Sequence, residues 1–497
     1  MNIFRESGKD AGMRMRDLFP EQNFFVTLFD DRVYAVGGAV RDLFLERERG
    51  DVDLLVVREE IDGVIAKLKR HGKVDVVGKA FGVIRFRYGG REFEIALPRV
   101  DVTDPEAKAD HKNFLVHADP WLPLEEDLRR RDFVCNSMAL NLKEGLLVDP
   151  FGGREDIGNR LLRMTDERSF FDDPLRILRG ARFAAYLGFK LEKRVYLKAA
   201  KTDLTALSAE RVSEELYKLL LTAPRPSVGL EAYFHLGVIR QLFPEIDRLT
   251  LTLQDQEFHP ERDARGNHTV WAHLLETVDN ARALAVREEH GLEKSRKLAL
   301  LLGALLHDLG KGETTRWEFK RGRMTITSNN HDTQWVKLGK GLMDRCRIFA
   351  YDGYPLRDRV LQLIGLHHRT FSYWRSRDTL TRKTLAKLYL EMGEDLLLLA
   401  LLDTADQSAR GGGVPPESLS ESGQWLLERI RRDNLNRESV KPLVMGRDLL
   451  AWDLLPGPNM GKILKALYEH QMEGRFTDRE SALLFARDYL RERGILP

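Results

Sequence analysis

Cysteine is scarce in this sequence. Only two of the 497 residues are cysteines, Cys135 and Cys346, and one pair cannot supply the disulfide framework that stabilises many secreted proteins. A low cysteine content without such a framework is typical of proteins in a reducing compartment. We therefore expect a cytoplasmic location.

Long hydrophobic runs are absent as well. The longest, LALLLGALL at residues 298–306, is far shorter than the roughly 20 apolar residues that cross a bilayer as a helix. The N-terminal residues do not show the order of a signal peptide, in which a basic segment precedes an apolar one. We expect neither a membrane span nor a signal peptide.

The sequence also lacks an excess of charge of either sign. Lysine and arginine number 79 and aspartate and glutamate 77, which leaves a formal net charge of +2. Nucleic-acid binding would therefore have to come from a local basic face. With 43% hydrophobic residues the composition is that of a globular protein, and the length suits three or more domains.

The patterns that are present divide the chain. Strand-like runs such as DLLVV, GVIRFRY and REFEIAL dominate up to residue 164, and helix spacing of Leu, Ala, Arg and Glu follows almost to the C-terminus. SARGGGVPPESLS at 408–420 is rich in Gly, Pro and Ser and predicts a linker. We predict an N-terminal extension (1–30), an α/β head (31–164), a helical neck (165–250), a middle helical domain (251–410) and a helical tail (411–497).

The stretch YAVGGAVRDLFLERERGDVDLLVV, residues 34–57, combines two features. Gly37 and Gly38 lie between a predicted strand and a predicted helix, where backbone N–H groups can approach an anion. Asp51 and Asp53 are two residues apart at the start of the next strand, so both carboxylates point to one face. Mg²⁺ prefers oxygen ligands of this kind. The stretch predicts a phosphate cradle beside a magnesium site.

Two further patterns extend this site. Glu94 in the strand REFEIAL is a candidate third carboxylate. Arg130, Arg131 and Asp132 precede a helix-like run that contains Asn136, upstream of the turn DPFGG. Each pattern taken alone also fits a solvated surface.

A stripe of arginines follows in FFDDPLRILRGARFAAYLGF, residues 170–189. Asp173 and Pro174 suit the N-cap and the first position of a helix. Arg176, Arg179 and Arg182 then recur every third residue and form one stripe along the helix. They form either a solvated basic face or guanidinium forks that bind phosphates or base edges, a task for which Arg is better suited than Lys.

Together, VGGAVRD, DVD, RRDFVCNSMA, DPFGG, DDPLRILRGARFAA and ERVSEELYKLL resemble the motifs of class II tRNA nucleotidyltransferases and bacterial poly(A) polymerases. This family is a branch of the DNA polymerase β-like nucleotidyltransferases, and the resemblance covers residues 31–245. It implies an α/β head with a mixed sheet and helices, followed by an elongated all-α body.

The resemblance also implies roles for the matched residues. Asp51 and Asp53 would hold Mg²⁺ for nucleotidyl transfer to a 3′-hydroxyl. Asp173 and Arg176 would read the base edge of the incoming CTP or ATP without a nucleic-acid template. The expected nucleotide-binding set comprises Gly37, Gly38, Arg41, Arg131, Asp173, Arg176, Arg179 and Arg182.

One position departs from the family pattern. Asp172 stands where the family usually has Glu, beside the expected base reader Asp173. The helix cap predicted for Asp173 also competes with base reading, because one carboxylate cannot do both fully, so Asp172 is an alternative cap.

The middle domain carries a second set of polar residues in HTVWAHLLETVDNA, ALLHDLGKGE, NNHDTQW, GLHHRTF and LLDTADQSARG. The arrangement resembles HD-superfamily phosphohydrolases. That resemblance implies a divalent-metal site whose ligands are His273, His307, Asp308 and Asp406. His331 and His367 are expected extras, and His268 competes with His273 for the first ligand position.

We expect this protein to add or repair the 3′-terminal CCA of tRNA using CTP and ATP, and to carry an accessory HD phosphohydrolase site. The expected partners are the tRNA 3′ end and nucleoside triphosphates, and no membrane. One alternative is a specialist that adds only A or only CC, or a poly(A) polymerase. The loop between Glu94 and Arg130 is long, which argues against a CC-only enzyme, but its acidic DVTDPEAKAD leaves an A-only enzyme open.

A rival from another class is an RNA-binding or HD-hydrolase protein with an inactive head, against which the Asp51–Asp53 pair speaks. The segment KPLVMGRDLLAWDLLPGPNMGKILKALYEHQMEGRFT resembles the tail of HD-bearing members of the family and predicts two helices. Lys462 and Lys465 there fit either a tRNA contact or a solvated helix face.

Overall fold

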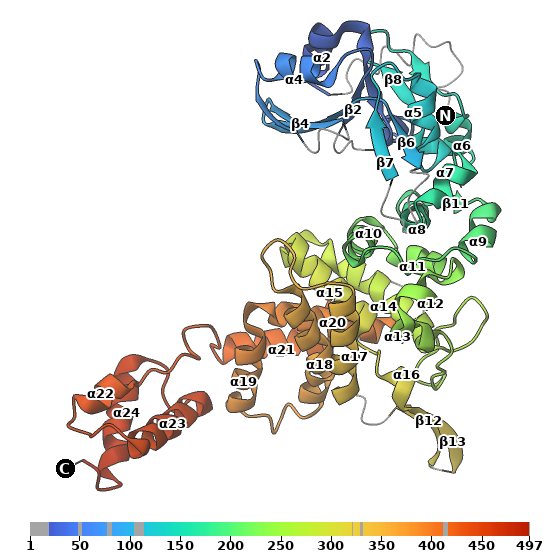
Figure 1. The fold of residues 1–497 in the computed structure, drawn as a ribbon. Coiled ribbons are helices and arrows are strands. Elements are labelled where there is room, and N and C mark those ends of the chain that lie inside the picture. Colours follow the sequence, from blue (N-terminus) through green and yellow to red (C-terminus); the bar gives the residue numbers. More distant parts are fainter. Residues whose placement is uncertain are drawn as a thin grey trace. The chain divides into compact units, whose positions relative to one another are not determined.

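The computed structural model describes residues 19–47, 52–76, 82–103, 114–320, 322–328, 332–410 and 416–496. The chain forms two compact units. One comprises residues 1–219 and 228–242, and the other comprises residues 220–227 and 243–497. Each unit is described by itself below (Figure 1).

The first unit contains a seven-stranded mixed sheet with the order β3-β4-β5-β2-β1-β8-β9. Strands β2 and β5 are parallel, and the other neighbouring pairs are antiparallel. The strands are β1 (Val33–Val36), β2 (Asp53–Val56), β3 (Lys73–Val76), β4 (Val83–Tyr88), β5 (Arg91–Ala96), β8 (Ala139–Asn141) and β9 (Leu147–Val148). The mixed sheet with helices expected for the head is confirmed.

Helices and short ladders complete the head. Phe25 of the first described helix packs on Phe86 and Phe93 of the sheet, with ring centroids 6.1 and 4.9 Å apart. The helices are α2 (Gln22–Phe29), α3 (Gly38–Phe44), α4 (Ile61–Leu68), α5 (Leu124–Arg129) and α6 (Gly153–Gly158), and an antiparallel pair is formed by β6 (Arg99–Thr103) and β7 (Phe114–Ala118). Residues 22–29 therefore contribute to the core of the head.

The remainder of the first unit is built around α8 (Leu175–Leu187). Gly180 lets this helix approach its neighbours closely, because a Cβ there would lie 3.1 Å from Phe133 and 3.0 Å from Leu191. The other elements are α7 (Glu167–Asp172), α9 (Lys193–Ala199), α12 (Val238–Leu242), β10 (Leu161–Leu162), β11 (Lys190–Leu191) and most of α10 (Ala209–Thr222) and α11 (Pro226–His235).

The second unit is mainly helical, as the spacing of its apolar residues predicts. Its helices are α13 (Pro244–Asp247), α14 (Val270–Ala285), α15 (Lys294–Leu306), α16 (Lys311–Thr314), α17 (Asp332–Arg345), α18 (Leu356–Arg375), α19 (Arg382–Met392), α20 (Leu396–Ala409), α21 (Glu421–Arg432), α22 (Gly446–Leu450), α23 (Pro458–Glu473) and α24 (Arg479–Arg491). Short 3-10 segments lie at Asp30–Arg32 and Val134–Asn136 in the first unit and at Arg248–Thr250, Glu288–His290 and Gly393–Asp395 in the second.

A β-hairpin interrupts the helical pattern of the second unit. Strands β12 (Thr315–Lys320) and β13 (Arg323–Ser328) pair in antiparallel register, with Gly322 at φ +79° in the turn. Alternating side chains place Trp317 and Phe319 on one face, and both are more than half exposed. The tail differs from the expectation in detail: α22 is short, and α24 joins α23 to close a small separate core around Leu449, Leu467 and Leu490.

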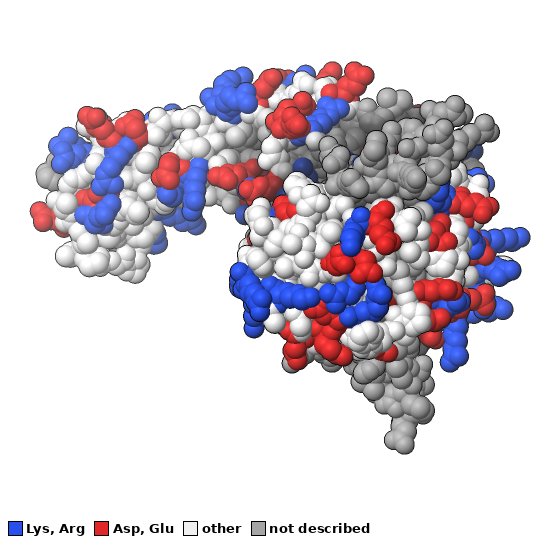
Figure 2. Space-filling view, turned by 90° about the horizontal axis from the view of Figure 1, so that it is seen from above, with Lys and Arg blue, Asp and Glu red and all other residues white. Residues whose placement is uncertain are grey.

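Two surface properties bear on the partners. Figure 2 shows Lys and Arg interspersed with Asp and Glu over the described part of the face in view, in keeping with the small net charge. Among the helices of the described residues, none is long and apolar enough to span a bilayer.

Candidate functional sites

The glycine turn between β1 and α3 is tightly enclosed. Gly37 has φ +70°, which L side chains rarely adopt. A Cβ there would lie 2.9 Å from Arg131 Nη1 and 4.0 Å from Asp53 Oδ2. A guanidinium and a carboxylate therefore both approach the backbone at the start of α3, whose first residue is Gly38.

Two predicted carboxylates lie side by side on the sheet. Asp53 of β2 and Glu94 of β5 are direct register partners in the parallel pair, and both side chains are exposed. Register partners point to the same face, so the sheet gathers two oxygen donors of the kind that a hard divalent cation prefers. Asp51 lies outside the described residues.

Arg41 is buried in the middle of α3. Its Nη1 donates a hydrogen bond to Asn136 Oδ1 at 2.7 Å, and its Nε donates to Asp42 Oδ1 at 2.8 Å. The guanidinium also lies over the ring of Phe183, 5.3 Å from its centroid. These contacts fix a positive charge beside the glycine turn.

A buried carboxylate orients the arginine pair. Asp127 accepts hydrogen bonds from Arg131 Nη2 and Arg130 Nε, each at 3.2 Å, and from the backbone N–H of Arg99. Burial opposes ionisation of Asp127, but the charges of Arg131 and Arg130 outweigh it and lower its pKa. Asp127 therefore stays ionised and holds Arg131 beside Gly37, a role that the sequence pattern alone did not indicate.

Asp132 joins the head to the arginine stripe. It accepts two hydrogen bonds from Arg179 on Oδ2, and Oδ1 accepts one from Asn136 Nδ2 at 2.9 Å. Burial raises the pKa of Asp132, but Arg179 and the Asn136 hydrogen bond reverse the effect and lower it to about 2.

The three arginines of α8 each have an anchor. Arg176 Nη1 donates to the carbonyl oxygen and the hydroxyl of Ser169 at 3.0 and 2.9 Å. Arg179 binds Asp132, and Arg182 Nε donates to the buried Glu215 at 2.7 Å. Arg179 and Arg182 therefore already bind carboxylates, so their charges are partly neutralised.

Asp173 contacts both the start of α8 and Arg211. Its Oδ1 accepts the N–H of Leu175, the first residue of α8, at 3.2 Å, and its two oxygens accept from Arg211 Nη2 at 3.1 and 2.9 Å. Asp172 is the last residue of α7, not the cap of α8. The N-cap of α8 is Pro174, one residue later than predicted, although Asp173 still accepts the N–H of Leu175. Arg211 comes from the motif ERVSEELYKLL, which supported the family resemblance but suggested no contact for this arginine.

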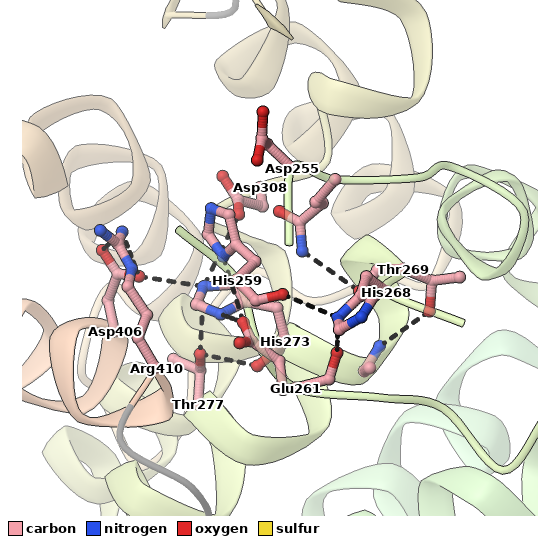
Figure 3. A network of polar contacts seen from close by, with 12 residues as sticks. Asp255, His259, Glu261, His268, Thr269, His273, Thr277, Asp308, Asp406 and Arg410 are labelled. Carbon is pink, nitrogen blue, oxygen red and sulfur yellow. Dashed lines mark hydrogen bonds and ion pairs between the residues drawn. The ribbon is translucent and has the colours of Figure 1, made fainter. Parts of the chain in front are cut away.

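The second unit brings together the four predicted HD residues, of which Figure 3 labels His273, Asp308 and Asp406. His273 on α14 places Nε2 2.9 Å from Asp406 Oδ1 and 3.8 Å from Asp308 Oδ2. His307, at the end of α15, places Nε2 3.4 Å from the same Asp308 oxygen and 3.9 Å from Asp406 Oδ1. All four residues are buried. Clustered imidazole and carboxylate donors of this kind fit a divalent transition metal.

Two histidines of this cluster present unused nitrogen atoms. Nδ1 of His307 and of His367 lies 2.9 and 2.7 Å from the carbonyl oxygens of Ala304 and Ile364. A carbonyl only accepts, so Nδ1 carries the proton and Nε2 has the lone pair. Both Nε2 atoms are buried and have no hydrogen-bond partner among the described residues. Such buried acceptors are unfavourable without a ligand, which supports the metal assignment.

Charged neighbours keep the carboxylates ionised. Burial opposes ionisation of Asp308, but Lys311 Nζ lies 2.7 Å from Oδ2 and the pKa falls well below its usual value. Burial likewise opposes ionisation of Asp406, and Arg410, whose Nη2 donates at 3.2 Å, lowers the pKa. A cavity of about 190 Å³ beside Asp406 is lined by Arg410 and His367.

The loop before α14 holds residues that sequence reasoning missed. Glu261 Oε1 lies 2.6 Å from His273 Nδ1 and 3.1 Å from His259 Nδ1. Burial raises the pKa of Glu261, but the hydrogen bonds from both histidines lower it to about 2. His268 lies apart from the four predicted ligands and contacts the backbone carbonyls of His259 and Glu261. His331 lies outside the described residues.

Comparisons with known proteins agree with this organisation. Residues 33–163 match the family described as "Poly A polymerase head domain", residues 188–250 match "Probable RNA and SrmB- binding site of polymerase A", and residues 270–411 match "HD domain". The resemblance inferred from the sequence motifs is thereby confirmed.

Curated relatives and a solved structure extend the comparison. The "Multifunctional CCA protein" of Methylococcus capsulatus is 34% identical over 88% of this chain and 93% of its own length. The protein of the same name from Stenotrophomonas maltophilia is 37% identical over 64% of this chain and 72% of its own. The CCA-adding enzyme of Bacillus stearothermophilus in complex with CTP has the same fold, with a TM-score of 0.61, 22% identity, and coverage of 96% of this chain and all of that one. This chain belongs to the family of the multifunctional CCA proteins.

Proposed function

We propose that this protein completes or repairs the 3′-terminal CCA of tRNA, using CTP and ATP. The 3′-oxygen of the tRNA attacks the α-phosphate of the nucleotide, a new P–O bond forms, and the bond to the β-phosphate breaks so that pyrophosphate leaves. The register pairing of Asp53 with Glu94, next to the glycine turn and Arg131, is the observation that carries the proposal.

The head residues divide the work of this reaction. Asp53, Glu94 and Asp51 would hold Mg²⁺, which when bound lowers the pKa of the 3′-hydroxyl and neutralises the developing phosphate charge. Arg131, held by Asp127, would bind the phosphates beside the N-terminus of α3. Gly37 leaves room for that approach, because a side chain there would collide with Arg131.

Base selection would rest on Asp173 and Arg176. Both groups are fixed by neighbours, Asp173 by Arg211 and Arg176 by Ser169. A rigid donor and acceptor discriminate between bases because the wrong base leaves a polar group without a partner. Arg41, Arg179 and Arg182 would contribute positive potential near the triphosphate, and Arg179 and Arg182 also bind the carboxylates of Asp132 and Glu215.

The HD residues support a second activity, the metal-dependent hydrolysis of phosphoesters. Its supporting observation is the convergence of His273, His307, Asp308 and Asp406 with the unpartnered Nε2 of His367. A divalent metal bound there would supply hydroxide from water. Arg410 lines the adjoining cavity and would bind the phosphate of the substrate.

The proposal includes the domain boundaries predicted from the sequence, with head 31–164, neck 165–250, HD domain 251–410 and tail 411–497. A tRNA contact by Lys462 and Lys465, both exposed on α23, stays a prediction. The cytoplasmic location also stays a prediction, in keeping with two free and buried thiols.

One assay separates the proposed reaction from the specialist alternatives. Three tRNA transcripts, one lacking CCA, one ending in CC and one complete, are offered CTP, ATP or both. A CCA-adding enzyme extends the first by CC with CTP alone and completes it with both nucleotides. Addition of A to the CC-ended tRNA without any use of CTP would show an A-adding enzyme, and long A tails on complete tRNA would show a poly(A) polymerase.

A further inference from the structure

His273 lies between two carboxylates. Its Nδ1 is 2.6 Å from Glu261 Oε1, and its Nε2 is 2.9 Å from Asp406 Oδ1 (Figure 3). The ring is fully buried, so water does not compete for either nitrogen. The two sides of one imidazole therefore face different groups, the HD cluster on one side and the loop before α14 on the other.

We propose that Glu261 is the positioning residue of the HD site, holding His273 in the tautomer and orientation in which Nε2 binds the metal. This inference rests on the proposed hydrolase function. Nδ1–H donates to Glu261, so the lone pair of Nε2 would serve a metal held with Asp308 and Asp406. Without a metal, Nε2 is the donor of its 2.9 Å contact with the Asp406 carboxylate. A carboxylate behind a ligating histidine fixes the ring and makes the ligating nitrogen more basic.

The other histidines of the cluster show the same arrangement with a weaker acceptor. His307 and His367 donate Nδ1–H to the carbonyl oxygens of Ala304 and Ile364, three residues earlier in their own chain segments. His273 alone among these three turns Nδ1 toward a side chain from another segment. Glu261 thus takes the place of the local carbonyl, and its negative charge makes it the strongest acceptor of the three.

Glu261 is itself held in place. His259 Nδ1 lies 3.1 Å from the same oxygen, and His268 Nδ1 lies 3.0 and 3.1 Å from the carbonyl oxygens of His259 and Glu261. His268 thereby fixes the backbone of the loop that carries Glu261. His273, the second histidine of HTVWAH, therefore lies in the HD cluster, and His268, the first, stabilises the loop that carries Glu261.

An alternative occupant of this loop is a separate metal ion. Ligand atoms of His259, Glu261 and His273 lie within 4.8 Å of one another. That arrangement would take Nδ1 of His273 for one metal while Nε2 serves another, which requires the ring to lose both protons. Positioning needs no such ionisation, and the number of bound ions distinguishes the two arrangements.

The test measures metal affinity rather than turnover. Metal-free full-length protein carrying Asp53→Ala, which removes a ligand of the head site, is titrated with Co²⁺ by calorimetry. Glu261→Gln keeps the size of the side chain and a neutral acceptor, and we expect it to raise the Kd about tenfold, with Glu261→Ala raising it up to about 100-fold. Glu257→Gln, a substitution at an exposed residue of the same loop that pairs with Arg323, should leave the Kd unchanged.

A double-mutant cycle separates positioning from a general structural role. If Glu261 acts through His273, Glu261→Gln has no further effect on the Co²⁺ Kd once His273→Ala is present. Equal effects in both backgrounds would overturn the proposal, as would unchanged affinity in Glu261→Ala. Loss of one of two bound ions in Glu261→Gln would show a separate metal site and also overturn it. Failure of the parent to bind any Co²⁺ would instead reject the hydrolase site, and the positioning role with it.

Discussion

Arg179 directs two of its donor nitrogens at one oxygen of Asp132, with Nε at 2.8 Å and Nη2 at 2.7 Å from Oδ2. This contact joins α8 to the segment that carries Arg131. Because Asp132 is buried, the pair also links the stability of the head to pH.

Acid should weaken the fold through Asp132. Its pKa of about 2 lies below its ordinary value of 3.8, so its contribution is complete above pH 3.8 and is lost as the pH falls through 2. That contribution is about 2 kcal/mol, roughly half of which is lost by pH 3. Urea unfolding at pH 5 and pH 3 should show a smaller loss of unfolding free energy for Asp132→Asn than for the parent. An equal loss in both proteins would contradict the assignment.

Adding a methyl group at Gly37 should damage catalysis more than folding. The new Cβ would lie 2.9 Å from Arg131 Nη1 and displace a guanidinium that the reaction uses. We expect Gly37→Ala to lower kcat/KM for nucleotide addition by at least about tenfold, since displacements of about 1 Å cost up to about 100-fold.

Gly90→Ala is the matched control. Gly90 has φ +79° in the turn between β4 and β5, with open space around its Cβ position. Both substitutions should cost about 1 kcal/mol of unfolding free energy through backbone strain, but only Gly37→Ala should lose activity. Comparable activity in the two variants would rule out a close approach at Gly37.

Nucleotide preference should depend on the anchor of Arg176. Arg176→Gln should reduce the ratio of correct to incorrect nucleotide added to a CC-ended tRNA, because the guanidinium fork is lost. Ser169→Ala leaves the arginine but removes a 2.9 Å hydrogen bond, so a smaller change in the same direction is expected. Steady-state kinetics with CTP and ATP check both variants, and a uniform loss of rate with unchanged preference would return Arg176 to the role of a basic surface residue.

The order of sheet and helices could be predicted from the sequence because the signals are local. REFEIAL and GVIRFRY alternate apolar and polar residues, and they form β5 and β4. The hairpin of β12 and β13 was missed, although TRWEFK alternates in the same way, because its apolar face lies exposed instead of in a core.

Site residues divide in the same manner. Glycine turns, paired aspartates and a His-Asp doublet have short-range spacing, so Gly37, Asp53 and Asp308 could be proposed from the sequence. Asp127 and Glu261 were not proposed, because no motif indicated their contacts: Asp127 binds Arg131 four residues later, a spacing that also fits a surface ion pair, and Glu261 meets Nδ1 of a histidine on the following helix. Both acidic residues are near a predicted site residue in the sequence, and their side chains are buried in the structure. Their burial would have identified them, but it cannot be read from the spacing of residues alone.

The two activities should be separable. His307→Ala removes a donor of the HD cluster, so we expect loss of metal-dependent hydrolysis of 2′,3′-cyclic nucleotides and phosphomonoesters. CCA addition should remain close to the parent rate, because no HD residue takes part in it. Thermal melting checks folding first, since losing a ligand can cost stability. Loss of nucleotide addition in a well-folded variant would show that the HD domain takes part in the transferase reaction.

The carboxylate pair on strands β2 and β5 is the centre of this account. The most direct measurement is the rate of CMP and AMP addition to a tRNA that lacks CCA, with Mg²⁺, CTP and ATP, for the parent, Asp53→Asn and Asp75→Asn. Asp75 is a partly exposed carboxylate on β3 of the same sheet, and its variant should react at the parent rate. Asp53→Asn should lose at least about 100-fold in kcat while still binding tRNA, because it removes a carboxylate ligand of the Mg²⁺ that neutralises the developing phosphate charge. Parent-like addition by Asp53→Asn, or no addition by the parent, would contradict the account.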